Sequence, residues 1–338
     1  MNISIVGAGA IGGILAAELS RTGNAVSVIA RGNHLSALCE NGLTLVHHPR
    51  GGEVQSYRLA AHGDPEQLAA EVGVQDIVII GLKANAIPRM LKKLRPLVGP
   101  STLVVPAING LPWWYFYREG GAYDGSVVRS VDPEGTLLDD LDGTHLVGCV
   151  VHLAGEVRSP GVVHYTAGKR LIIGEIDRSL PAAQTARIER LGGVLAEAGF
   201  DAVVSKDIRT DVWEKLIGNL SFNPVAALTS SLMNQICDDE AVLGIVRPLL
   251  QEGMQVAARY GIHIRMTPDE RIDLARQLGG AKISMHQDFE NHRPPEIDAI
   301  VGAVIELAER VSVEVPTIRI IDALVRARAR NLHLLPGR

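Results

Sequence analysis

The sequence near the start of the chain, NISIVGAGAIG at residues 2–12, is the strongest indication of the fold. A mostly apolar run of strand length leads into closely spaced glycines, and a helical pattern begins where they end. In such a turn the first glycine permits a tight bend, the second lets backbone approach a pyrophosphate, and the third packs helix on strand. The pattern therefore predicts a dinucleotide-binding turn, and a plain glycine-rich turn is the alternative. The residues of this turn are Gly7, Ala8, Gly9, Ala10, Ile11 and Gly12.

Predicted strands and helices continue to alternate along the chain after this turn. Apolar runs of strand length at 25–30, 76–82 and 102–107 alternate with helical patterns at 12–21 and about 85–97. Near-continuous apolar runs are typical of parallel strands that are covered on both faces. We therefore expect an α/β fold with a doubly wound sheet of Rossmann type. Later runs are interpreted as an extension of that sheet, at 127–131, 147–153, 162–166 and 171–174.

From about residue 207 the strands vanish and the pattern is helical almost throughout. We therefore predict two domains, an NADP-binding Rossmann domain at 1–206 and an all-helical domain at 207–338. No apolar run approaches the roughly 20 residues that would span a bilayer, so no membrane partner is expected.

Composition excludes several function classes. The formal net charge of −5 over 338 residues indicates no nucleic-acid partner. The cysteines, Cys39, Cys149 and Cys237, are isolated, which favours a reducing compartment, and the chain start lacks the features of a signal peptide. We therefore expect a cytoplasmic protein. The histidines show no ligand spacing, so no metal is expected.

The residue after the second apolar run bears on the choice of cofactor. An acidic residue there would accept the ribose 2′-OH of NAD. This chain has Arg31 instead. A guanidinium binds a 2′-phosphate through charge-assisted hydrogen bonds, whereas a carboxylate would repel it. Arg31 therefore predicts NADP, used as NADPH, and an exposed arginine without a ligand is the alternative.

Two more polar residues follow the ends of buried strands, Lys83 and Asn109. The carboxyl ends of strands in open α/β sheets border the ligand crevice. We therefore expect both residues to line the cofactor groove, Lys83 as a cation and Asn109 as an amide near the nicotinamide, where Asn109 is also expected to contact the substrate. The alternative is that these residues only serve to form turns, and this applies above all to the pair Asn109-Gly110.

The helical half contains WEKLIGNLSFNP, residues 213–224, in which Lys215, Asn219 and Asn223 are four residues apart. This spacing puts their side chains on one face of a helix. Apolar residues between them indicate that this face borders the protein interior, although a solvated surface is also possible. Pro224 lacks an N–H group, so we expect the helix to kink or stop there.

Motifs along the whole chain together resemble those of the ketopantoate reductases, or 2-dehydropantoate 2-reductases. They are the glycine turn with Arg31, GLKA at 81–84, Asn109-Gly110, WEKLxxNxxxNP at 213–224, SMxQD at 284–288, RPPEID at 293–298 and VPTI at 315–318. The resemblance implies reduction of a 2-oxo acid, a small molecule, with NADPH. It also implies that a helical second domain supplies the acid.

The resemblance assigns roles residue by residue. It implies that Lys215 is the proton donor, and that Asn219 and Asn223 contact the substrate. The resemblance also implies that Ser284 binds the substrate carboxylate. Glu296 is implied to bind a substrate hydroxyl and to help position Lys215. Other readings remain: Lys215 could extend to solvent, Ser284 could form a capping box with Gln287, and Glu296 could stabilise a helix start.

Some positions depart from the family pattern. Ile108 stands where members commonly have Gln, and Asn234-Gln235-Ile236 replaces a common Asn-Gly-Glu segment. Five consecutive aromatic residues, 113–117, follow Asn109 closely. They could form an aromatic wall at the nicotinamide end of the cleft, suited to a larger substrate. They could instead be an interdomain clamp or a subunit contact in a homodimer.

We therefore expect reduction of 2-dehydropantoate to pantoate, for pantothenate biosynthesis, with Lys215 as general acid. One alternative is a reductase or dehydrogenase of the same family that acts on a different, bulkier 2-oxo acid or on a D-2-hydroxy acid. A more distant alternative is a non-catalytic NADP-sensing protein.

Overall fold

The computed structural model describes residues 1–180 and 186–335, and the chain divides into two compact units. Unit 1 comprises Met1–Ile108, Trp114–Ser126 and Thr136–Ile208. Unit 2 comprises Asn109–Trp113, Val127–Gly135 and Arg209–Arg338. Two short segments from the first half of the chain therefore belong with the C-terminal helices, and one of them begins at Asn109.

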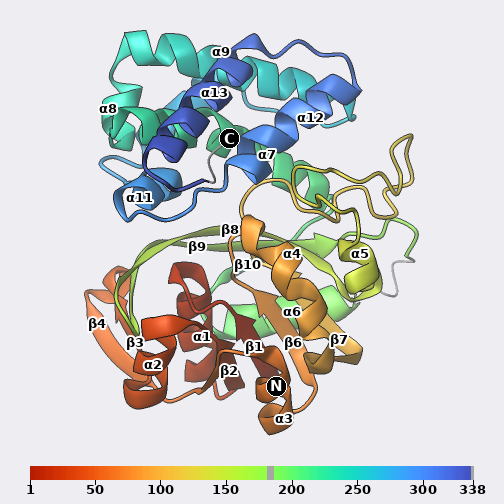
Figure 1. Ribbon diagram of the computed structural model, residues 1–338, viewed down its shortest axis with the longest axis vertical. Helices are drawn as coiled ribbons and strands as arrows, with labels where there is room; N and C mark the ends of the chain where they lie inside the picture. The colour runs from red at the N-terminus through yellow and green to blue at the C-terminus, as the bar shows by residue number, and fades with distance from the viewer. Residues whose placement is uncertain (181–185, 336–338) are drawn as a thin grey trace. The chain divides into compact units, whose positions relative to one another are not determined.

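Unit 1 contains the predicted parallel sheet, which confirms the α/β fold (Figure 1). Its strands lie side by side in the order β5 (Ala60–His62), β2 (Ala25–Ile29), β1 (Asn2–Val6), β6 (Gln75–Ile80) and β7 (Val98–Pro106). Every pairing in this sheet is parallel. The apolar runs form strands because both faces are covered: four of the five residues of β1 are buried.

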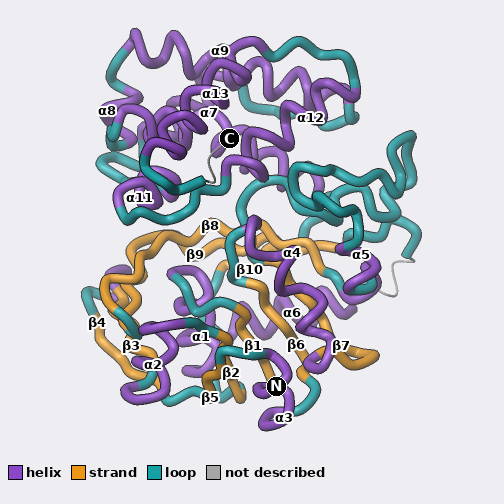
Figure 2. Tube along the Cα trace, in the orientation of Figure 1, coloured by secondary structure: helices purple, strands orange, loops and turns teal. Residues whose placement is uncertain are grey.

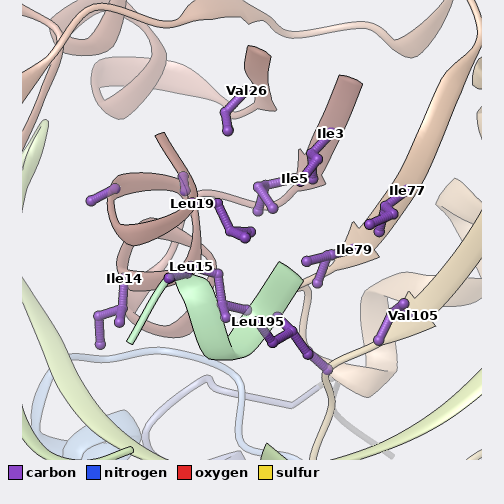
Figure 3. Close-up of a cluster of buried hydrophobic side chains, with 14 of the residues drawn as sticks. Ile3, Ile5, Ile14, Leu15, Leu19, Val26, Ile77, Ile79, Val105 and Leu195 are labelled. Atoms are coloured by element: carbon purple, nitrogen blue, oxygen red, sulfur yellow. The ribbon is translucent and has the colours of Figure 1, made fainter. Parts of the chain in front are cut away.

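Helix α1 (Ala10–Arg21) packs between this sheet and a second one. All residues from Gly12 to Leu19 are buried, so the helix has no solvent-exposed face in this stretch. Figure 3 shows Leu15 and Leu19 in the cluster of buried side chains that also holds Ile5 of β1. On another face, a Cβ at Gly13 would lie 2.7 Å from Val163 of the second sheet. Small residues in α1 thus permit close packing on two sides.

The second sheet corrects the predicted sheet extension. Its order is β10 (Asp201–Val204), β9 (Val162–Glu175), β3 (Leu43–His47) and β4 (Glu53–Tyr57), and β8 (Val147–Ser159) also pairs with β9. Figure 2 shows these strands in orange. β8 and β9 form a long antiparallel hairpin, so they satisfy each other's hydrogen bonds locally and do not extend the parallel sheet.

Three of the predicted strands are wrong in detail. The runs 162–166 and 171–174 belong to one continuous strand, β9. Residues 127–131 form turns and no strand. Their backbone is held by a side chain instead, because the Glu306 carboxylate accepts hydrogen bonds from the N–H groups of Arg129 and Ser130, both at 2.8 Å.

The predicted helix at 85–97 is broken into short pieces. They are a 3-10 turn (Ala84–Ala86), α4 (Ile87–Met90) and a second 3-10 stretch (Leu91–Leu97). Pro88 stands at the start of α4 and Pro96 lies inside the second 3-10 stretch, and neither can donate the N–H that an uninterrupted α-helix over 85–97 would need. The other helices of unit 1 are α2 (Gly32–Asn41), α3 (Pro65–Val72), α5 (Leu137–Asp140) and α6 (Ala186–Glu197).

The C-terminal region is helical, as predicted. Its helices are α7 (Ile208–Thr229), α8 (Met233–Cys237), α9 (Glu240–Arg259), α10 (Pro268–Arg276), α11 (Ser284–Glu290), α12 (Ala303–Arg310) and α13 (Pro316–Asn331). A π-helical turn, Asp298–Gly302, precedes α12. Helix α7 does not stop at Pro224 but continues for five more residues. The residues around the proline are buried, so tertiary packing holds the helix where one hydrogen bond is lost.

Candidate active site

The glycine turn after β1 has the backbone geometry that a dinucleotide requires. Gly7 has a φ of +96°, in the region that favours glycine. A Cβ at Gly12 would lie 1.9 Å from the carbonyl oxygen of Gly7, so only glycine lets the helix approach the strand this closely. A Cβ at Gly9 would meet no atom of the described residues within 4 Å, which leaves open space beside the backbone.

The start of α1 suits an anion. Its N-cap is Gly9, which has no side chain to bind the first amides, and the first three helical residues, Ala10, Ile11 and Gly12, are uncharged. The first N–H groups of a helix lack intrahelical partners and lie at the positive end of its dipole. A pyrophosphate satisfies both conditions. The residues of the turn therefore fit a bound dinucleotide.

The predicted cofactor residues Arg31 and Lys83 follow the two strands that flank β1. The last residue of β1, Val6, pairs with Ile29 at the end of β2 and with Ile80 at the end of β6. All three strands therefore end at the same edge of the sheet. Arg31 is exposed at the N-cap of α2, and Lys83 is half-buried just after β6. Both cations lie where a strand gives way to a turn at this edge.

The three polar residues predicted to share one face of α7 form a polar strip that is only partly exposed to solvent. Asn223 is 3% exposed, and Lys215 and Asn219 are half-buried. The apolar residues between them are buried, namely Leu216, Ile217, Leu220 and Phe222. Asn219 forms no side-chain hydrogen bond to any residue in the described part of the chain, so its amide can serve a ligand.

Lys215, Asn109 and Glu296 form a chain of hydrogen bonds within unit 2. The Nζ of Lys215 donates to Oδ1 of Asn109 at 2.7 Å. The Nδ2 of Asn109 donates to Oε2 of Glu296 at 3.3 Å. The amide of Asn109 therefore has a defined orientation, with its oxygen on the cation and its nitrogen on the carboxylate. Glu296 is 7% exposed, so the charges at the two ends are linked in a largely desolvated place.

Backbone packing holds Asn109 against the segment that follows Glu296. The N–H of Leu111 donates to the carbonyl oxygen of Ala299 at 2.8 Å. Gly110 has a φ of +82°, and a Cβ there would lie 2.5 Å from the same oxygen. Ala299 belongs to the π-helical turn, and such turns are frequent at functional sites. The pair Asn109-Gly110 thus forms a turn, and this turn also places the side chain of Asn109 in the site.

Asn223 and Ser284 meet at the other end of the strip. The Nδ2 of Asn223 donates to Oγ of Ser284 at 3.4 Å. The capping-box alternative for Ser284 does not occur, because the N-cap of α11 is Ile283 and Gln287 binds the carbonyl of Lys282. The exposed hydroxyl of Ser284 therefore lies beside an amide of α7.

Four of the five aromatic residues at 113–117 are packed inside the protein, and Tyr117 is half-buried. The exposed fractions of Trp113, Trp114, Tyr115 and Phe116 are 4%, 1%, 3% and 2%. The rings of Tyr115 and Phe116 meet edge to face, with centroids 4.9 Å apart. A Cβ at Gly148 would lie 3.0 Å from the Trp114 indole. The burial of Trp113, Trp114, Tyr115 and Phe116 does not fit a subunit contact made by these side chains.

The described residues hold no group of three or more histidine, cysteine or acidic side chains that is arranged to bind a metal. Within residues 1–180 and 186–335, no helix has the length and apolar character that crossing a membrane requires.

Two family models match the chain. The one described as Ketopantoate reductase PanE/ApbA matches residues 3–178, and the one described as Ketopantoate reductase PanE/ApbA C terminal matches residues 207–329. Both the parallel-sheet region and the helical region are therefore covered by models of the same family.

Known proteins give the same result. The 2-dehydropantoate 2-reductase of Mesorhizobium japonicum is 40% identical over 331 residues, which cover 97% of this chain and 98% of that protein. A crystal structure from Ralstonia solanacearum, described as a ketopantoate reductase, is 37% identical with a TM-score of 0.90, and 99% of each chain is covered. The 2-dehydropantoate 2-reductase structure from Geobacter metallireducens is 27% identical with a TM-score of 0.82, covering 97% of this chain and 99% of that one.

Proposed function

This chain belongs to the ketopantoate reductase family, and from that premise we propose that it reduces 2-dehydropantoate to pantoate with NADPH. The observation that carries the proposal is the hydrogen-bonded chain of Lys215, Asn109 and Glu296. Carbonyl reduction generates an alkoxide, which needs a nearby positive charge and a proton. An ammonium held by a fixed amide, with a carboxylate behind it, supplies both.

Bound NADPH supplies the hydride that reduces the 2-oxo carbon. Lys215 has two tasks: its positive charge stabilises the negative charge that develops on the oxygen, and one of its N–H groups then gives that oxygen a proton. The 2-oxo acid becomes a 2-hydroxy acid. The neutral amine regains its proton from solvent before the next turnover.

The neighbours of Lys215 have separate roles in the proposal. The carbonyl oxygen of Asn109 fixes the direction of the ammonium, because an amide oxygen accepts and does not compete as an acid. The carboxylate of Glu296 balances the positive charge and accepts a hydrogen bond from the substrate hydroxyl. Asn219, Asn223 and Ser284 give neutral polar contacts to the substrate, and we assign the substrate carboxylate to Ser284.

The substrate is tested by NADPH oxidation with 2-dehydropantoate and with 2-oxo acids that have larger side chains. We expect the highest kcat/KM for 2-dehydropantoate. The 40% identity to a 2-dehydropantoate 2-reductase, over 97% of this chain, supports this expectation. A higher kcat/KM for a bulkier 2-oxo acid would favour the alternative substrate, and Ile108 would be the first position to examine. No NADPH oxidation with any 2-oxo acid would refute the function.

Arg31 accounts for the proposed choice of NADPH. We expect Arg31→Ala to weaken NADPH binding by about 10- to 100-fold, since charge-assisted bonds to the 2′-phosphate are lost, and to leave NADH binding nearly unchanged. The measurement is the Kd of each nucleotide by fluorescence titration. Arg158→Ala is the matched control, because Arg158 is also exposed in unit 1 and its guanidinium pairs with Glu156. An unchanged ratio of the two Kd values would mean that Arg31 does not bind the phosphate.

A further inference from the structure

The glycine turn is tied down by a side chain from α2, His34. The Nε2 of His34 lies 2.7 Å from the carbonyl oxygen of Ala8, in the middle of the turn. Its Nδ1 lies 3.1 Å from the backbone nitrogen of Gly161, between β8 and β9 of the second sheet. One imidazole ring therefore joins the predicted dinucleotide turn to a hairpin of the second sheet, and all three residues belong to unit 1.

The two partners determine the tautomer of His34. The carbonyl of Ala8 can only accept a hydrogen bond, so Nε2 must carry the hydrogen. The N–H of Gly161 can only donate, so Nδ1 must present its lone pair. The neutral ring with hydrogen on Nε2 is the one form that makes both bonds.

The bond to Ala8 controls the direction of a neighbouring amide. The carbonyl of Ala8 and the N–H of Gly9 belong to one planar peptide group. The peptide bonds of the described residues are all trans, so these two groups point in opposite directions. Holding the carbonyl of Ala8 therefore also fixes the N–H of Gly9, which is the N-cap of α1 and lies where the pyrophosphate is expected.

Backbone hydrogen bonds anchor the turn on both sides of the peptide group between Ala8 and Gly9, and His34 binds the carbonyl of that peptide group. The N–H of Gly7 donates to the carbonyl of Ile29 at 2.9 Å. The carbonyl of Gly9 accepts from the N–H of Gly13 at 2.7 Å. The peptide between Ala8 and Gly9 lies between these anchors and is flanked by glycines, which allow many backbone conformations. A bond to its carbonyl is therefore the contact that selects one orientation.

We propose that His34 is a positioning residue for cofactor binding, which presets the amide of Gly9 for the pyrophosphate. The proposal rests on the proposed use of NADPH. His34 touches the turn and not the reacting atoms, so its loss raises the Kd and KM for NADPH and leaves kcat at saturating NADPH unchanged.

Two near-isosteric variants separate the two bonds of the ring. In His34→Gln the side-chain amide occupies the place of Nε2 and can still donate to Ala8. In His34→Asn the amide reaches only the place of Nδ1 and can still accept from Gly161. His34→Leu makes neither bond. Thermal unfolding of all three variants shows whether the fold is intact.

The measurement is the Kd for NADPH by fluorescence titration, together with kcat and KM. We expect His34→Asn and His34→Leu to weaken NADPH binding by about tenfold, and His34→Gln to stay within about twofold of the wild type. Equal Kd values in all variants, or weaker binding in His34→Gln than in His34→Asn, would overturn the role of His34. If the wild type binds NADH alone and the variants keep their order with NADH, the role of His34 stands and the NADPH assignment fails. A wild type that binds neither nucleotide overturns both.

Discussion

Lys215→Ala is expected to lower kcat for 2-dehydropantoate reduction by about 10²- to 10⁴-fold, which is the usual contribution of a general acid. The variant loses the ammonium that stabilises and protonates the alkoxide. Asn109 and Glu296 remain, but an amide is not an acid and the carboxyl oxygen of Glu296 acts as a hydrogen-bond acceptor. The Kd for NADPH should stay close to the wild-type value, since the glycine turn and Arg31 are unaltered.

Controls distinguish acid catalysis from loss of charge or fold. Lys282 is also in unit 2, and its Nζ forms an exposed pair with Glu290 at 2.7 Å, so Lys282→Ala should keep full activity. Lys215→Arg retains the charge but is a far weaker acid, so it should bind the substrate and turn over slowly. Single-turnover kinetics with NADPH already bound isolate the chemical step. A wild-type rate in Lys215→Ala would remove the proton-donor role.

Glu296→Gln should give the second-largest effect, a fall in kcat of about 10²-fold. Glutamine preserves the shape and can still accept from Asn109 through its carbonyl oxygen. It removes the negative charge that balances Lys215 in a buried place, where an unpaired charge is costly. It also gives the amide of Asn109 a neutral acceptor, so the ammonium is less firmly directed.

Glu290→Gln is the matched control for Glu296→Gln, because Glu290 is an exposed carboxylate in the same unit, paired with Lys282. Steady-state kinetics on both variants should show the loss of kcat in Glu296→Gln alone. Equal activity of the two would mean that the carboxylate at position 296 supports the helix start and not the reaction.

The parallel sheet could be predicted because its signals are local. The apolar run ahead of the glycine turn forms β1, Asn2–Val6, and the turn follows it directly. β3 and β4 escaped prediction for a physical reason. In β3, buried and half-buried residues alternate, and most of β4 is exposed, so neither forms an apolar run. Strands of this kind are recognised by their pairing partners, which lie elsewhere in the chain.

The site is predictable only in part. Four-residue spacing was enough to place Lys215, Asn219 and Asn223 on one face of α7. The contacts that orient Lys215 are not local, because Asn109 is 106 positions away from Lys215 and 187 from Glu296. Position alone predicted that Asn109 lines the cofactor groove, whereas its observed partners are a lysine and a glutamate of the helical unit.

His34 shows the same limit for the cofactor turn. A lone histidine three residues after Arg31 has no motif around it, and its partners Ala8 and Gly161 are 26 and 127 positions away. Backbone groups are its partners, and backbone groups are the same in every sequence. Only the folded chain brings this ring to the turn.

The most direct test of the proposed chemistry is a crystal structure of the protein with NADP⁺ and pantoate. We expect the 2-hydroxyl oxygen of pantoate to lie about 3 Å from the Nζ of Lys215, within hydrogen-bond reach, while Asn109 still holds the ammonium. A structure in which that hydroxyl binds another donor, and the amine of Lys215 points away from the substrate, would contradict it.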